Sequence, residues 1–247
     1  MRAILAKELR QLFHSPLAWG VLAALQLILA WLFMLQLEQF LQIQQRLTTL
    51  QSTLGVTALV IAPLIDSAAT VALLMTPLLT MNSFSREYQQ GTIDLLLAAP
   101  ISSAAIVGGK FLALLLVLVC AWLLVAAMPL SLLVGTWPDI GTLIASLLAL
   151  ALALAGYAAI GLWASSLTTQ PAIAAVISYA VLLLLSTLNL TAGAAPDSPL
   201  LVLSLSFHLQ RMLGGLVGSG DLIYFALLVA TPLLLTVMRL RRLRGGG

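Results

Sequence analysis

Six long apolar stretches, separated by short polar segments, dominate the sequence. Each is long enough to cross a bilayer, because a spanning helix needs roughly 20 mostly apolar residues. The pattern therefore predicts six transmembrane helices. Their approximate ranges are residues 17–37, 58–81, 111–135, 141–163, 172–190 and 222–238.

The composition supports the same fold class. Hydrophobic residues make up 62% of the 247 residues and charged residues only 8%, whereas a soluble domain carries about 25% charge. We therefore predict an all-α polytopic membrane protein that forms a single domain, residues 1–247. Cys120 is the only cysteine, which excludes an internal disulfide and an internal cysteine metal site. The first apolar stretch lacks a convincing cleavage site, so we expect it to be a span and not a signal peptide.

The first 16 residues predict an amphipathic helix before the first span. On a helical wheel, Lys7 and Arg10 share one half with Gln11 and His14, and the aliphatic residues and Phe13 occupy the other half. Glu8 falls inside the apolar arc and is the exception. We expect this segment to lie flat at the membrane surface, with a merely solvated basic leader as the alternative.

Two other segments outside the spans carry structure of their own. Residues 38–57 are rich in Gln and Thr and predict a polar, partly helical extension outside the membrane. Residues 191–221 form a longer extracytoplasmic region. Within it, residues 199–213 are apolar but too short and too interrupted to span, so we expect a re-entrant or interfacial helix.

The distribution of positive charge predicts the orientation, because Lys and Arg are enriched in cytoplasmic loops. Arg46 and Arg211 fall on one side of the predicted spans. The other nine basic residues fall on the opposite side, which predicts that both termini and residues 83–110 are cytoplasmic. These nine are Arg2, Lys7, Arg10, Arg86, Lys110, Arg239, Arg241, Arg242 and Arg244.

Residues 83–110 form the interior segment with the most charge, and they predict a docking site. Gly91 frees the backbone, Thr92 is a candidate helix cap, and Pro100 ends a short apolar helix at residues 93–99, since the residue before a proline disfavours helix. Ser102 or Ser103 can cap the next helix. A helix of seven residues is only about 10 Å long and marginal alone. It therefore needs a partner surface.

Other candidates for chemistry are few. Asp66 lies well inside the second predicted span, where carboxylates are costly and often functional. The alternative is that Asp66 sits near the outer end of the span, hydrated or hydrogen-bonded to Ser67 or Thr70. No metal site is predicted, and no Walker A, G-x-S-x-G or H-E-x-x-H motif is present. The sequence thus offers no visible catalytic equipment.

The block TPLLTMNSFSREYQQGTIDLLLAAPISSAAIVGGKF resembles the ABC-2 class of ABC transporter permeases. More narrowly, it is similar to the branch of gliding-motility-associated and multicopper-enzyme-maturation permeases. Further similarity lies in KELRQLFHSPLAW, GLWASSLTTQPAIAAVISYA and SFHLQRMLGGLVGSGDLIYF. The residues that match the branch pattern are Pro77, Thr80, Met81, Glu87, Gly91, Thr92, Leu95, Leu96, Leu97, Pro100, Gly109, Lys110 and Phe111.

This resemblance implies a six-span permease, similar to type V exporters, in the bacterial inner (cytoplasmic) membrane. It implies a dimer of identical or related permeases bound to two copies of a separate ABC ATPase. ATP and Mg²⁺ would bind to that ATPase, and this chain would bind no cofactor. A lipid-like cargo and an extracytoplasmic accessory protein are compatible with it, and nucleic acid is not an expected partner.

The resemblance also implies roles for individual residues. The helix after the second span would be the coupling helix, seated in a groove of the ATPase. The N-terminal helix would be the connecting helix beside the same ATPase. The implied coupling residues are Glu87 as a polar contact, Leu95 and Leu96 as apolar anchors, Ile93, and Gly91, Thr92 and Pro100 at the helix ends; those of the connecting helix are Lys7, Glu8 and Arg10.

Three alternatives stay open at this point. A complex of the same architecture can transmit ATP-driven force to an extracytoplasmic partner without moving a solute. A stand-alone secondary transporter would need internal repeats or several buried ionisable residues, and only Asp66 is a candidate. An intramembrane enzyme lacks the residues for its chemistry.

Overall fold

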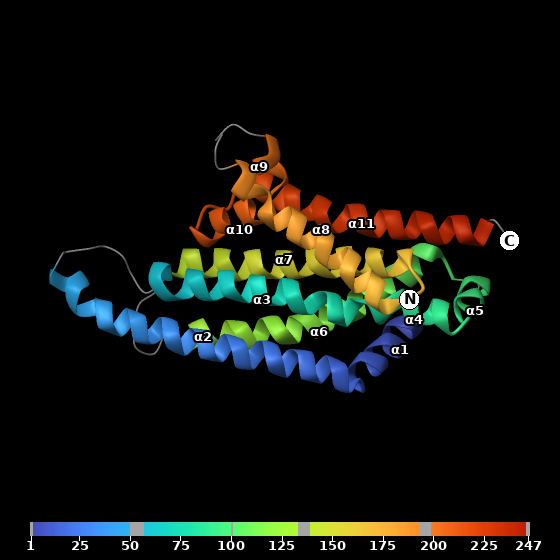
Figure 1. Cartoon of the computed structure of the whole chain (residues 1–247), viewed down its shortest axis with the longest axis horizontal. Coiled ribbons are helices and arrows are strands. Elements are labelled where there is room, and N and C mark those ends of the chain that lie inside the picture. The colour runs from blue at the N-terminus through green and yellow to red at the C-terminus, as the bar shows by residue number, and fades with distance from the viewer. Residues whose placement is uncertain (1, 50–56, 100, 133–138, 193–198, 246–247) are drawn as a thin grey trace.

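The computed structural model describes residues 2–49, 57–99, 101–132, 139–192 and 199–245. Over this part of the chain the secondary structure is helical, and six helices are long and apolar enough to cross a membrane. The prediction of an all-helical, six-span membrane protein is confirmed. Figure 1 shows the long helices running side by side along one axis.

The helices follow one another with short connections. α3 is preceded by a turn of π-helix, η1 (Thr57–Ile61). The helices are α1 (Arg2–Phe13), α2 (Pro16–Thr49), α3 (Ala62–Thr80), α4 (Asn82–Gln89), α5 (Ile93–Ala98), α6 (Ser103–Ser131), α7 (Ile140–Leu167), α8 (Pro171–Ala192), α9 (Pro199–Leu203), α10 (Leu205–Leu213) and α11 (Ser219–Gly245).

α7 is the central helix of the bundle. It packs against α3, α6, α8 and α11. Small residues allow this close packing. A methyl group added at Gly161 would lie 2.7 Å from Thr80 Cβ, and one added at Gly156 would lie 2.5 Å from Leu228 Cδ2. Gly161 and Gly156 are therefore points of close packing against α3 and α11.

The bundle has two unlike ends. Both termini lie at the end that holds α1, α4 and α5, called the basal end here, while α9 and α10 lie at the other, distal end (Figure 1). The termini therefore share one end, as the charge distribution predicts. α2 is 34 residues long, or about 51 Å at 1.5 Å per residue, so it extends past a hydrocarbon core of about 30 Å. This length agrees with the predicted helical extension as far as Thr49; residues 50–56 lie outside the described residues.

Two parts of the fold differ from the sequence-based expectation. Residues 82–89 form a helix, α4, where we expected a polar stretch, because the helix buries Phe84, Ser85 and Glu87 against the bundle. The expected single helix at residues 199–213 is two helices. Ser204 separates them, since its extended backbone breaks the first helix and its side chain accepts a hydrogen bond from Phe207 N at the start of α10 (3.3 Å).

The contact between α3 and α7 is tight enough to test. Gly161→Val adds side-chain atoms against Thr80, which is 1% exposed and has no room to move away. We expect a loss of about 1–3 kcal/mol of stability from this overpacking, measured as a lower midpoint of thermal unfolding in detergent. Gly20→Val is the matched control, because a Cβ at Gly20 meets nothing within 4 Å. Equal midpoints for the two variants would contradict this packing.

Candidate coupling site

Lys110 is the centre of a buried ion cluster at the basal end. Only 2% of its surface is exposed. Its Nζ donates to Glu8 Oε1 at 2.8 Å, to Glu87 Oε1 at 2.9 Å and to the Ser83 carbonyl oxygen at 2.7 Å. An ammonium group has three N–H donors, so these three acceptors satisfy it completely. The contacts join α1, α4 and α6.

The cluster explains why Glu8 interrupts the apolar face of the N-terminal helix. Glu8 is 7% exposed and faces Lys110 rather than lipid or water. Gly109 permits this approach, because a methyl group there would lie 3.0 Å from Ile4 Cγ2. α1 therefore rests directly on the first turns of α6.

Lys7 completes the charge balance from outside. Its side chain is 59% exposed, and its Nζ lies 3.2 Å from Glu87 Oε1 and 3.8 Å from Glu8 Oε1. The two ammonium groups face two carboxylates, so the cluster carries no net charge. This matters because an uncompensated charge is strongly unfavourable in a buried position.

α5 follows the cluster after a tight turn. Gly91 has φ +64°, a conformation that suits glycine, and Thr92 N donates to the Glu87 carbonyl oxygen at 3.0 Å. The expected side-chain cap by Thr92 is wrong, since its hydroxyl donates to the same Glu87 carbonyl (3.4 Å) and bonds no backbone N–H of α5. Ser102 does cap α6, accepting from Ala105 N at 3.2 Å.

α5 exposes a large apolar side chain. Leu95 is 74% exposed, Leu96 is half-buried against the core, and Ile93 is 7% exposed and faces inward. The helix lies at the basal end, in the position that the resemblance assigns to a coupling helix. Of the apolar residues expected in the coupling helix, Leu95 is the one most available to a partner.

Other expected site residues fall in different places. Glu87 lies inside the ion cluster and not on the surface, so the structure places it away from the position expected of a partner contact. Arg10 is exposed on α1, where it lines a shallow polar groove with Lys7 and His14. Pro100 lies outside the described residues.

The C-terminal helix also reaches the coupling segment, which the sequence did not indicate. Arg244 donates from Nη1 to the Ile101 carbonyl (2.7 Å) and from Nη2 to the Ala99 carbonyl (3.1 Å). These are the carbonyl groups that follow α5. The hydrogen bond from Arg244 to Ile101 joins residues 143 positions apart in the sequence, and no local pattern indicated it.

Asp66 stands apart from this site. It is half-buried in the second turn of α3. Of the two side chains named in the alternative, Thr70 donates to the Asp66 backbone carbonyl (3.0 Å), whereas Ser67 donates to the Pro63 carbonyl (2.8 Å). Among the described residues, no group of three or more His, Cys, Asp or Glu side chains could hold a metal ion.

A second polar cluster fastens the distal end. His208 Nδ1 lies 2.7 Å from Asp221 Oδ1 and its Nε2 lies 3.0 Å from the Val202 carbonyl, while Asp221 Oδ2 accepts from Gly218 N at 3.0 Å. Arg211 lies 3.6 Å from the same carboxylate. These contacts join α9 and α10 to the first turn of α11, far from the basal end.

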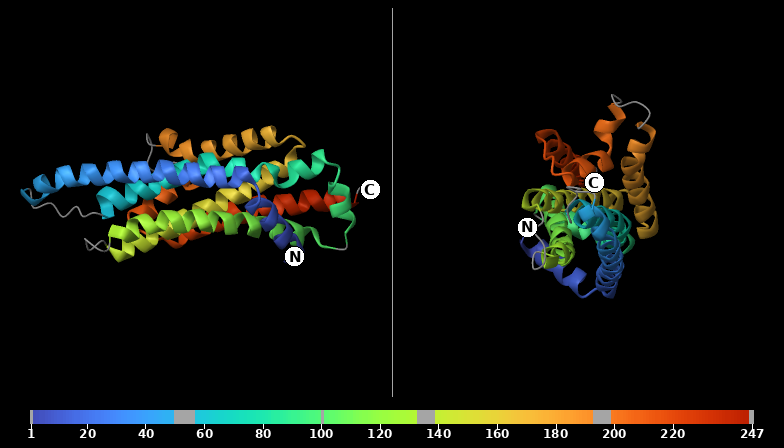
Figure 2. Two further views of the ribbon diagram at one scale, coloured as in Figure 1. Left: turned by 90° about the horizontal axis from the view of Figure 1, so that it is seen from below. Right: turned by 90° about the vertical axis from the view of Figure 1, so that its left-hand side faces the viewer.

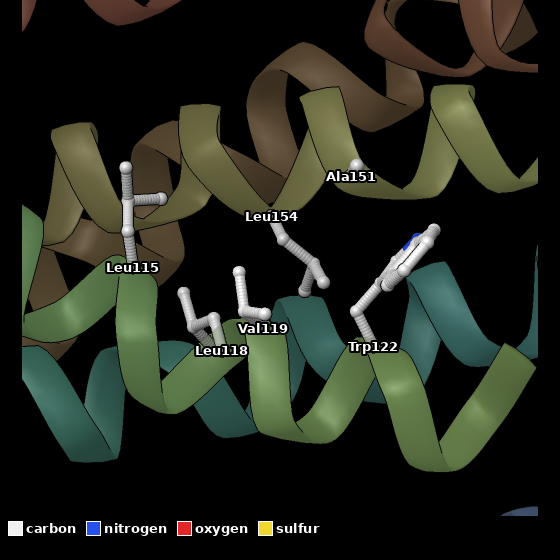
Figure 3. Close-up of a pocket in the computed structure, with 6 residues that line it drawn as sticks. All are labelled: Leu115, Leu118, Val119, Trp122, Ala151 and Leu154. Carbon is white, nitrogen blue, oxygen red and sulfur yellow. The ribbon is translucent and has the colours of Figure 1, made fainter.

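The space between the spans is apolar. Figure 3 shows one groove, of about 200 Å³, where Leu154 and Ala151 on α7 face Val119 and Trp122 on α6. Trp122 Nε1 donates to the Leu147 carbonyl at 2.8 Å, so its polar atom is satisfied within the chain. Such a groove suits hydrocarbon and offers no contact for an ion.

Comparison with known protein families agrees with this geometry. Residues 2–202 match the family described as "ABC-2 family transporter protein". The chain belongs to this family. No curated protein matches the chain.

An ABC-2 permease is the membrane subunit of a transporter and has no catalytic activity of its own. The expectation that this chain is not an enzyme is therefore confirmed by its family. The family also implies a separate ATPase as partner. The match includes α1 to α8 and thus the whole ion cluster of this permease.

The ion cluster makes a sharp prediction for stability. Lys110→Met leaves the Glu8 and Glu87 carboxylates buried without their main partner, so we expect a loss of about 3–5 kcal/mol. Lys7→Met is the matched control. Because Lys7 is more than half exposed, its loss should cost about 1 kcal/mol or less. Thermal unfolding of both variants in detergent measures the difference.

A triple variant separates charge from packing. Adding Glu8→Gln and Glu87→Gln to Lys110→Met removes the buried carboxylates, and we expect it to recover part of the lost stability. If Lys110→Met unfolds at the same temperature as Lys7→Met, the cluster does not stabilise the basal end.

Proposed function

We propose that this permease couples ATP hydrolysis by a separate ABC ATPase to export of a substrate, with α5 as the coupling helix. The observation that supports this most is the exposed Leu95 on a short helix whose neighbours are fixed by the buried ion cluster. A coupling helix must pass a movement of the ATPase on to the spans without changing its own position relative to them. The ion cluster that joins α1, α4 and α6 would give the region next to α5 the necessary rigidity.

The movement of the ATPase would reach the spans through the contacts of α4 with α5, α6 and α1. ATP-driven closure of the ATPase would press on α5, which connects through α4 to Glu87 and from there to Lys110 on α6. Glu8 extends the same unit to α1, whose exposed Lys7 and Arg10 offer polar contacts to the ATPase. Only a difference in contact between two states can shift the equilibrium between them. The cluster would keep α1, α4 and α6 together in both.

The assembly and location follow from the same proposal. Two permeases and two ATPases form the complex, with ATP and Mg²⁺ bound to the ATPases. The complex lies in the bacterial inner membrane with the basal end in the cytoplasm, which the excess of Lys and Arg at that end supports. The motif around Glu87 and Lys110 supports the branch of gliding-motility-associated and multicopper-enzyme-maturation permeases. The apolar groove between α6 and α7 favours a lipid-like cargo.

Docking of the ATPase is tested by Leu95→Asp. A charge at this exposed position should abolish co-purification of the ATPase in detergent, because an apolar pocket disfavours an unpaired carboxylate. The unfolding temperature of the permease should stay unchanged. Leu216→Asp, at a leucine 66% exposed beyond α10, is the matched control and should keep the ATPase. Normal recovery of the ATPase with Leu95→Asp would refute the docking site.

The orientation is tested by labelling single cysteines in a Cys120→Ser background. We expect a membrane-impermeant maleimide to label Leu216→Cys in intact spheroplasts and Leu95→Cys only after the membrane is opened. Both positions are exposed, so access depends on the side of the membrane. The reverse order of labelling would contradict a cytoplasmic basal end.

A further inference from the structure

α8 and α11 diverge above α7 and leave a groove between them. The end-on view in Figure 2 shows α11 and α8 on separate sides of the space over α7. The groove has a volume of about 550 Å³ and is lined almost entirely by apolar side chains from these three helices and α9. Val181, Leu185, Leu227 and Leu228 are among them. At the depth of the spans, such a surface must be covered by hydrocarbon.

Toward the basal end, the lining of this region becomes partly basic. A second cavity, of about 390 Å³, shares Trp163 and Leu235 with the first and also includes Arg239 and Arg242. The two cavities are therefore neighbours along α7 and α11. The apolar groove ends beside a cavity that includes two guanidinium groups.

Arg239 is held in place at this junction. Its Nη2 donates to the Leu167 carbonyl at the end of α7 (3.2 Å). Its Nε is buried and has no hydrogen-bond partner among the described atoms. A guanidinium group presents donors that match phosphate oxygens in pairs. The fixed Arg239 and the exposed Arg242 thus form the polar end of the groove.

The basal half of the groove, from Leu228 to the arginines, matches one leaflet of a bilayer in length. Leu228 precedes Arg239 by eleven residues, which is about 16 Å along a helix. Half of a hydrocarbon core of about 30 Å is about 15 Å. A chain that follows the groove from Leu228 would therefore bring its headgroup to the level of the two arginines.

We propose that this groove binds an anionic glycerophospholipid from the leaflet at the basal end. One acyl chain lies between α8 and α11 on α7, and the phosphate contacts Arg239 and Arg242. The two guanidinium groups at the basal end complement the negative charge of a phosphate, so charge complementarity favours the lipid. The groove in Figure 3 is equally apolar but includes no charged residue, and it lacks the same recognition. The proposal does not rest on the ATPase.

Native mass spectrometry of the detergent-purified permease tests this proposal. The protein is incubated with equal amounts of phosphatidylglycerol and phosphatidylethanolamine, and the ratio of bound lipids is measured. We expect wild-type protein to retain phosphatidylglycerol preferentially. The Arg239→Gln, Arg242→Gln double variant should lower that preference by about tenfold, since each arginine contributes to binding of an anionic lipid. Arg242→Gln alone keeps the bond from Arg239 to Leu167 and should act in the same direction.

Arg241→Gln is the matched control. It removes the same charge from the neighbouring position, but Arg241 does not line the groove. We expect a preference within twofold of the wild type. An equal loss in Arg241→Gln would show attraction by the whole basic surface and overturn the site, and so would a wild-type protein without a preference between the two lipids.

Cross-linking tests the competing occupant. Leu227→Cys, at a groove residue 60% exposed, is placed in the Cys120→Ser background and oxidised in membranes. We expect the protein to remain un-cross-linked, because a lipid covers the position. Efficient disulfide formation between two copies would overturn the proposal in favour of a protein interface. Recovery of the ATPase is measured in parallel and should be normal, so a failure here is distinct from a failure of docking.

Discussion

A lysine buried to 2% exposure needs opposite charges around it, and this need organises the basal end. Lys110 finds one carboxylate on α1 and one on α4. Removing Lys110 would leave both carboxylates buried without their main partner, which costs far more than the loss of a surface ion pair. The three helices are therefore held in one arrangement, and the apolar packing of Ile4 against Gly109 acts in the same direction.

The fixed positions of α1, α4 and α6 allow α5 to act as the proposed coupling helix. A helix of six residues cannot hold its own orientation in water. Here the Gly91 turn attaches it to α4, and Arg244 from α11 binds the carbonyl groups that follow it. α1, through the ion cluster, and α11, through Arg244, thus both contact the segment that contains α5. The distal end has a separate fastening, through His208 and Asp221.

The sequence predicts the six spans well, because length and apolar composition alone decide whether a helix can cross a bilayer. The sequence also predicts the position of α5, because Gly91 marks the turn just before the helix. The partners of Glu8 and Lys110 were not predictable, because they lie 102 residues apart and no periodicity links them. The one indication of a buried ion pair in the sequence was Glu8 itself, because it is a charged residue on the apolar face of a helix. α4 was missed because its inward face contains Ser85 and Glu87, which appear polar in sequence but are buried.

In the proposed mechanism, α1 and α4 move as one body when the ATPase acts. Spin labels at Gln11 on α1 and Gln89 on α4, both exposed, report the distance between the two helices by electron paramagnetic resonance. The complex with the ATPase is measured without nucleotide and with ATP. We expect the same distance distribution in both states for the wild type, and a broader, nucleotide-dependent one for Lys110→Met. A wild-type distance that changes with ATP would contradict this mechanism.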